Sequence, residues 1–311
     1  MNNIICIAGP TASGKTALSI ALAKELGAEV VSCDSMQVYK RMDIGTAKPT
    51  TEEMDGVPHH MLSVTEPWED FSVGKYCQMA TPIVDDILAR GKTAIVAGGT
   101  GLYMDALIRG NDFAPIPSTG RREELEQLAA EKGIDAVIEM LRKVDPASAE
   151  RLHPSDQKRI IRAMEVYLET GKTITQHNLE TQQIPDRYHP VWFALEDVPR
   201  TTLYDRIDRR VEGMLQQGLM AEIQSLLNEG VPEKATSMQA IGYKEFVDVL
   251  RGRSSMEAAT ALVQQSSRKY AKRQLTWFRR NPAIHWLRRE ENDTAAQILA
   301  KARQILTESD N

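Results

Sequence analysis

The sequence predicts an α/β protein: a P-loop-containing parallel sheet domain flanked by helices, with an inserted all-helical subdomain. An apolar run at residues 4–8 leads directly into a glycine-rich stretch at 9–16, which an amphipathic helix pattern follows. Further strand-like runs occur at 29–33, 93–97 and 190–195, whereas the stretch between the last two is dominated by charged helical patterns. We therefore expect residues 1–111 and 189–311 to form the sheet domain with C-terminal helices. Residues 112–188 form the expected insertion, an all-helical subdomain.

The glycine-rich stretch fits G-x-x-x-x-G-K-S/T, the pattern of a phosphate-binding loop. Glycines allow backbone N–H groups to point toward a ligand, and the positive end of the following helix adds to the field. A lysine then neutralises phosphate charge and a hydroxyl ligates Mg²⁺, here Lys15 and Thr16. The alternative is a glycine-rich turn that binds nothing. The predicted loop consists of Gly9, Pro10, Thr11, Ala12, Ser13, Gly14, Lys15 and Thr16.

Composition limits the partners and the compartment. The net charge of −5 gives no global basic surface, so nucleic-acid binding must depend on local patches. The residues before the first apolar run are not basic, and the run itself is only as long as a strand. We therefore expect neither a signal peptide nor a membrane partner. Cys6, Cys33 and Cys77 are isolated, which argues against a disulfide framework or a zinc site and favours the reducing cytoplasm.

Asp34 and Ser35 follow the second predicted strand, at 29–33. Because ligands bind at the carboxyl ends of parallel strands, we expect Asp34 to face the space above the phosphate loop. Two alternatives stay open: Asp34 only caps a turn, or it holds Mg²⁺ through water. The polar segment from Gln37 to Pro49 is predicted to be a long ordered active-site loop.

His59 and His60 are adjacent, and neighbouring residues do not present two ligands to one face of a regular element. We expect packed, hydrogen-bonded histidines. After a helix at 71–90, the strand at 93–97 runs into a glycine-rich turn at 98–101. These glycines allow close backbone approach and place the Thr100 hydroxyl at the ligand edge of the sheet.

The C-terminal part has two clusters of basic residues on predicted helices. On the helix at 199–217, Arg206, Arg209 and Arg210 share one side and could clamp an anion. The longest helix pattern, at 257–280, has six basic residues and no acidic one after position 267. Four of them lie together and predict binding to a phosphate backbone, with a solvated face as the alternative: Lys269, Lys272, Arg273 and Arg280.

Short motifs follow one another along nearly the whole chain: Gly9 to Thr16, Asp34-Ser35 with Gln37-Val38-Tyr39, Asp43 to Pro49, Pro58-His59-His60, Gly98 to Tyr103, Gln157-Lys158-Arg159, Ile241-Gly242-Tyr243 and Lys272 to Arg279. In this order they resemble the tRNA dimethylallyltransferases, the bacterial isopentenyl-diphosphate:tRNA transferases. The resemblance implies transfer of the dimethylallyl group from dimethylallyl diphosphate to N6 of the adenosine at position 37, directly 3′ of the anticodon, with release of diphosphate. The enzyme would act in the cytoplasm and bind the tRNA anticodon stem-loop, and nothing in the sequence requires more than a monomer.

The resemblance also implies roles for individual residues. Lys15 and Arg206 would hold the diphosphate, Thr16 would hold Mg²⁺, Asp34 would be the general base and Thr100 would contact the target nucleotide. ATP binding by the loop stays open. The segments implied to meet tRNA comprise Asp34, Ser35, Met36, Gln37 and Thr100; Gln157, Lys158, Arg159, Ile160 and Ile161; Met238, Gln239, Ala240, Ile241, Gly242 and Tyr243; and Lys272, Arg273, Gln274, Leu275, Thr276, Trp277, Phe278 and Arg279.

Three alternative functions share part of these features. A small-molecule P-loop kinase would use Asp34 to deprotonate a hydroxyl, but it leaves the basic helix without a role. A nucleotide-gated RNA-binding module would leave the placement of Asp34 and Thr100 unexplained. Prenylation of free AMP or ATP would explain neither the basic helix nor the insertion.

Overall fold

The computed structural model describes residues 4–110, 119–182 and 185–309, and its centre is a parallel sheet of six strands. The strands are β1 (Ile4–Ala8), β2 (Glu29–Ser32), β3 (His59–His60), β4 (Ala94–Gly98), β5 (Val191–Val198) and β6 (Ile284–Glu290). Their order in the sheet is β3-β2-β4-β1-β5-β6, and every pair is parallel. The predicted fold class is confirmed.

Strands β1, β2 and β4 are buried along nearly their whole length because both faces of the sheet centre are covered. Ile5 and Ile7 of β1 join one core with Leu18 and Leu22 of helix α1 (Lys15–Leu26) and Ile298 of α14 (Ala295–Ser309). Helices α3 (Val73–Ala89) and α4 (Gly101–Arg109) pack against β4 as well.

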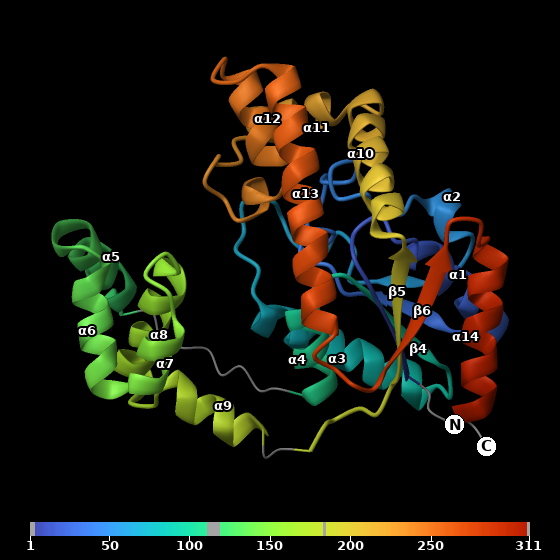
Figure 1. The fold of residues 1–311 in the computed structure, drawn as a ribbon, viewed down its shortest axis with the longest axis horizontal. Helices are drawn as coiled ribbons and strands as arrows, with labels where there is room; N and C mark the ends of the chain where they lie inside the picture. Colours follow the sequence, from blue (N-terminus) through green and yellow to red (C-terminus); the bar gives the residue numbers. More distant parts are fainter. Residues whose placement is uncertain (1–3, 111–118, 183–184, 310–311) are drawn as a thin grey trace. The chain divides into compact units, whose positions relative to one another are not determined.

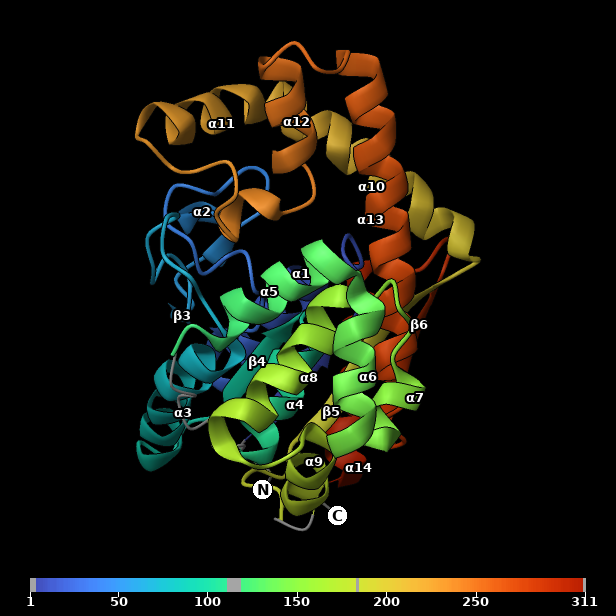
Figure 2. The ribbon, with the colours of Figure 1, turned by 90° about the vertical axis from the view of Figure 1, so that its left-hand side faces the viewer.

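A second group of helices lies beyond the carboxyl ends of the strands, toward which the arrowheads of β5 and β6 point in Figure 1. These are α10 (Arg200–Gln216), α11 (Leu219–Asn228), the short η1 (Ser237–Gln239), α12 (Tyr243–Leu250) and α13 (Met256–Phe278). The segment that follows β2, which includes α2 (Thr51–Met54), passes below α11 and α12 in Figure 2. Loops and helices therefore surround the edge of the sheet where the phosphate loop begins.

The chain divides into two compact units, Met1–Gly110 with Arg187–Asn311, and Asn111–Asp186. In the second unit, Val137, Leu141 and Ile160 belong to one apolar core. The proline-containing connector predicted at 111–117 lies outside the described residues. The helices of the second unit are α5 (Arg121–Lys132), α6 (Ile134–Val144), α7 (Pro146–Arg151), α8 (Gln157–Thr170) and α9 (Ile174–Gln182).

Two strands were absent from the sequence-based expectation. β3 is two residues long, too short for any periodicity, and β6 is an edge strand whose side chains are partly exposed. β6 pairs with β5 from Trp192 opposite Ile284 to Val198 opposite Glu290. Among the described helices, none combines the length and the apolar character needed to cross a bilayer.

Candidate active site

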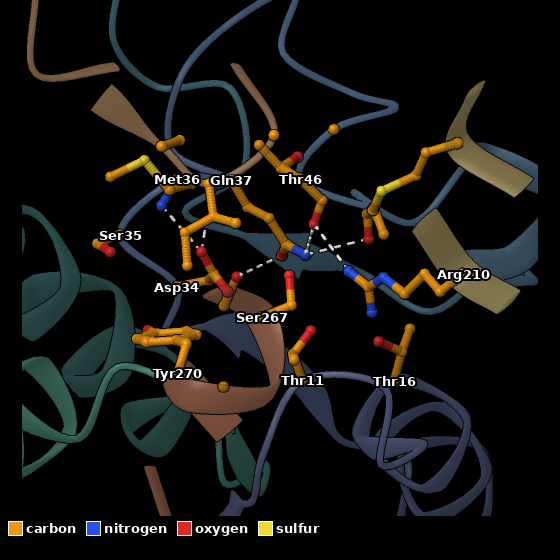
Figure 3. Close-up of a pocket in the computed structure, with 18 of the residues that line it drawn as sticks. Thr11, Thr16, Asp34, Ser35, Met36, Gln37, Thr46, Arg210, Ser267 and Tyr270 are labelled. Atoms are coloured by element: carbon orange, nitrogen blue, oxygen red, sulfur yellow. Dashed lines mark hydrogen bonds between the residues drawn. The ribbon is translucent and has the colours of Figure 1, made fainter. Parts of the chain in front are cut away.

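A cavity of about 520 Å³ opens at the carboxyl ends of β1, β2 and β4. Lys15 and Thr16 of the predicted phosphate loop line it, together with Asp34 after β2, Arg210 of α10 and Tyr270 of α13. Figure 3 shows these groups around one space, except for Lys15. The structure thus brings together the loop, the strand-end carboxylate and one arginine of the predicted anion clamp.

The backbone of the loop turns sharply where the sequence predicted it. Ala12 and Gly14 have φ of 61° and 89°, in the left-handed region, and α1 begins at Lys15. Lys15 Nζ donates to the Pro10 carbonyl at 2.7 Å. Burial, with Arg210 nearby, lowers the pKa of Lys15 to about 8. An anionic ligand would restore the charge that this environment disfavours.

Gln274 of α13 braces the loop from the other side. Its Oε1 accepts from Thr11 N at 2.9 Å, and its Nε2 donates to the Gly99 carbonyl at 2.9 Å. Because both bonds connect residues far apart in sequence, the sequence analysis did not find this role. Gln274 is 6% exposed, and its side chain also lines the cavity.

A second hollow of about 600 Å³ lies beside the loop and is lined by Arg206, Arg209 and Arg210. Arg206 reaches the buried Asp197 carboxylate at 3.2 Å, and Arg289 of β6 donates to the same Asp197 oxygen through Nε at 2.7 Å. Arg289 also donates to the Ser13 carbonyl at 3.0 Å. Asp197 therefore fixes Arg206 next to the loop. Neither Asp197 nor Arg289 was predicted from the sequence: Asp197 lies on β5 beyond the predicted run at 190–195, and Arg289 lies on β6, which was not predicted as a strand.

Asp34 both caps a turn and lines the cavity. Its Oδ1 accepts from Met36 N at 2.8 Å and Gln37 N at 3.4 Å (Figure 3). These bonds form an Asx turn that orients the carboxylate. The turn-capping alternative therefore describes the hydrogen bonds of Oδ1, while the residue also lines the cavity.

Gln37 and Arg210 meet at the backbone of the predicted active-site loop. Gln37 Nε2 donates to the Thr46 and Ala47 carbonyls at 3.3 and 3.2 Å, and Arg210 donates to Thr46 at 3.5 Å. Burial lowers the pKa of Arg210 from its usual value. Tyr270, missed by sequence reasoning, has its pKa raised to about 12 by burial and by Asp34, so its hydroxyl stays protonated.

Thr100 precedes α4, and its hydroxyl accepts from Ser35 N at 3.0 Å. The glycines on either side of Thr100 allow close contact with other segments of the chain. A Cβ on Gly98 would collide with the Cys33 carbonyl, and one on Gly101 would collide with the Trp277 ring. Thr100 itself contacts the turn that carries Asp34.

The segments implied to bind tRNA contain both exposed and buried side chains. Ile160 and Ile161 belong to the core of the second unit, and Met238 and Tyr243 are fully buried. Leu275 and Phe278 are 3% and 2% exposed. At these positions hydrophobic packing orients the side chains inward, and the expectation that these segments meet tRNA stays a prediction. Exposed side chains remain at Gln157, Lys158, Arg159, Gln239, Lys272, Arg273, Thr276 and Arg279, with Ala240 and Ile241 half-buried and lining the cavity beside Gly242.

The basic stretch at 268–280 extends past α13, which ends at Phe278 and not at the predicted residue 280, and two of its arginines form ion pairs. Arg268 pairs with Asp208, and Arg279 pairs with Glu196 at 2.5 Å. The four residues predicted to share one face are exposed: Lys269, Lys272, Arg273 and Arg280. Arg273 and Arg280 lie over the Tyr270 and Trp277 rings, at 5.5 and 4.5 Å from the ring centroids.

The histidines have the predicted packed role. His60 Nε2 lies 2.8 Å from Glu29 Oε2, and His59 Nδ1 lies 2.9 Å from the Val57 carbonyl oxygen. Cys6, Cys33 and Cys77 are buried and free. Within the described ranges, no group of three or more His, Cys, Asp or Glu side chains could hold a metal ion.

Comparisons with known proteins agree with the resemblance seen in the motifs. Residues 37–281 match the IPP transferase family model, and residues 2–65 match the isopentenyl transferase model. A tRNA dimethylallyltransferase of Acetivibrio thermocellus is 42% identical over 98% of both chains. A tRNA isopentenylpyrophosphate transferase structure from Bacillus halodurans aligns with a TM-score of 0.74 and 41% identity, over 99% of this chain and 96% of that one.

A eukaryotic dimethylallyltransferase, whose structures are described as snapshots of the enzyme acting on tRNA, aligns with a TM-score of 0.81 and 30% identity. The alignment spans 98% of this chain and 79% of the other. Both family models and these full-length similarities point to one assignment: the chain belongs to the IPP transferase family.

Proposed function

We propose that this protein transfers the dimethylallyl group from dimethylallyl diphosphate to N6 of the adenosine at position 37 of tRNA, and releases diphosphate. One observation carries the proposal. A carboxylate, Asp34, lines the same cavity as Lys15, Thr16 and Arg210 at the phosphate loop. A proton acceptor and a cationic phosphate cradle therefore share one space, as substitution at an amine with departure of diphosphate requires.

The loop would hold the diphosphate of the donor. Backbone N–H groups, Lys15 and Arg206 supply positive charge where negative charge grows as the carbon–oxygen bond breaks. Asp197 and Arg289 support this arrangement because they fix Arg206 beside Gly14.

Mg²⁺ fits this donor set. The Thr16 hydroxyl and the Asp34 carboxylate line one cavity and are hard oxygen ligands, which Mg²⁺ prefers together with waters and substrate phosphates. Thr16 would hold the ion directly. Because Asp34 is proposed to accept the substrate proton, it would contact the ion only through a water molecule. When bound, the ion neutralises charge on the diphosphate.

Asp34 would act as the general base. The N6 lone pair of adenine is delocalised into the ring, so the amine is a weak nucleophile and gains from proton removal. A bond forms between N6 and C1 of the dimethylallyl group, the C1–oxygen bond breaks with its electron pair passing to diphosphate, and the N6 proton passes to Asp34 Oδ2. The Asx turn through Oδ1 keeps the carboxylate oriented.

The RNA partner would be the anticodon stem-loop, from which the target base must be extruded to reach a buried donor. Thr100, next to Ser35, would contact that nucleotide, and the exposed cations of α13 would bind phosphates. We further propose a monomer that acts in the cytoplasm. The buried free cysteines fit a reducing compartment.

Incubation with labelled dimethylallyl diphosphate tests the proposal. Label should enter unmodified tRNA in the presence of Mg²⁺ and should not enter AMP or ATP. Label in free nucleotide alone would favour nucleotide prenylation. Phosphate transfer from ATP to a small molecule, without prenylation, would favour the kinase alternative.

A further inference from the structure

Glu222 of α11 connects two segments of the site that are far apart in sequence. Its Oε2 accepts from Asp43 N and Ile44 N at 2.8 and 2.7 Å. Its Oε1 accepts from Gly45 N at 3.1 Å and from the Tyr243 hydroxyl at 2.6 Å. We call this carboxylate, the three amides and the tyrosine hydroxyl the Glu222 clamp. Each oxygen of the carboxylate accepts two hydrogen bonds.

Tyr243 closes the clamp from the start of α12. The side chain is fully buried, and a Cβ at Gly45 would collide with its ring, so the loop can pack here only with glycine at that position. Burial, with the Glu222 carboxylate nearby, raises the pKa of Tyr243 well above its usual value. The hydroxyl therefore stays protonated and donates.

The clamped amides directly precede the carbonyls that orient two cavity residues. Thr46 accepts from Gln37 and from Arg210, and Ala47 accepts from Gln37 (Figure 3). Ser32 Oγ holds the other end of the Gln37 amide at 3.0 Å. Any shift of residues 43–45 would therefore move Gln37 and Arg210, which line the cavity beside Asp34 and Lys15.

We propose that Glu222 is a positioning residue for the transfer reaction: through the clamp it fixes the 43–47 loop and thereby the orientation of Gln37 and Arg210. This inference rests on the proposed function. A carboxylate is required because four donors converge on it, whereas a glutamine offers one acceptor oxygen and turns an N–H group toward at least one donor. The clamp also joins Tyr243 of α12, in a segment implied to meet tRNA, to the 43–47 loop that lines the cavity.

Two variants and one control test the clamp. Glu222→Gln disrupts the acceptor set, and Tyr243→Phe removes one hydroxyl while keeping the ring beside Gly45. Glu229→Gln is the matched control, because Glu229 is the C-cap of the same helix, α11. This substitution removes only an exposed ion pair with Arg41 and a carboxylate acceptor for the Ser225 hydroxyl. The full-length protein is used, and circular dichroism with thermal melting verifies folding.

We expect Glu222→Gln to slow single-turnover transfer at least about tenfold with saturating donor and tRNA, because a misplacement of 1 Å can cost about 10² in rate. Tyr243→Phe should slow it less, and Glu229→Gln should stay within about twofold of wild type. Amide exchange at residues 43–45 should accelerate in both clamp variants, a local signature that a general loss of stability would not give.

The inference is overturned if wild type transfers the label and folded Glu222→Gln stays within about twofold of its single-turnover rate. If Glu222→Gln does not fold, Tyr243→Phe decides, and an unchanged rate with unchanged exchange at 43–45 overturns the inference. If the wild-type protein transfers no label to tRNA, the proposed function fails, and this inference fails with it. The wild-type reaction alone therefore distinguishes this outcome from failure of the inference.

Discussion

Asp34→Asn separates the possible roles of the strand-end carboxylate. Asparagine keeps Oδ1 as the acceptor for Met36 N and Gln37 N, so the Asx turn should survive. The substitution removes the basicity of the second oxygen and one negative charge near Lys15 and Arg210. Loss of a positioned general base costs about 10² to 10⁴ in rate, or about 2.7 to 5.5 kcal/mol of transition-state stabilisation.

The assay is single-turnover transfer with saturating tRNA and donor, together with binding of each substrate and a Mg²⁺ titration. We expect the rate to fall by about 10² to 10⁴ while both affinities stay within a few-fold. Weak donor binding that extra Mg²⁺ restores would assign Asp34 to the metal. A rate close to wild type would refute the base assignment and leave only the turn-capping role.

The remaining predictions concern the donor site, its protonation and the basic helix. Lys15→Ala and Thr16→Ala should abolish transfer and leave tRNA binding largely intact, and full activity of either variant at saturating tRNA would remove the loop from the mechanism. Because the pKa of free Lys15 is about 8 and bound diphosphate favours the charged form, binding of diphosphate at pH 8.5 should take up protons, and affinity should weaken as pH rises above 8. Calorimetry in buffers of different ionisation enthalpy measures this uptake, and equal uptake by Lys15→Met would assign it to another group. Lys272→Ala with Lys269→Ala should weaken tRNA binding and flatten the dependence of log K on log salt by about 0.7 to 0.9 per lost contact, without changing donor affinity; an unaltered slope would show that this face is only solvated.

Local signals in the sequence predicted the centre of the site. The phosphate loop was predictable because strand, glycines, lysine and helix follow one another within a few residues. Asp34 could be placed because parallel strands bring their carboxyl ends to one edge of the sheet. These steps need only periodicity and topology, and the structure places Lys15, Thr16 and Asp34 around one cavity.

The supports of the site were not predictable in this way because they depend on long-range contacts. Gln274 reaches Thr11 across 263 positions, and Glu222 reaches the amide of Ile44 across 178. Helical periodicity places Leu275 and Phe278 on one apolar stripe. The resemblance of the segment from Lys272 to Arg279 to the family motif, however, suggested RNA contact for the same two residues. The structure places both side chains in the interior, which follows only from the packed fold.

The position and chemistry of the modification test the central claim most directly. Unmodified tRNA should be incubated with the protein, dimethylallyl diphosphate and Mg²⁺, then digested to oligonucleotides and nucleosides and analysed by mass spectrometry. The account predicts one dimethylallyl group on N6 of the adenosine at position 37, and no product from a tRNA with guanosine there. A dimethylallyl group at another position, or equal modification of the guanosine-37 tRNA, would contradict it.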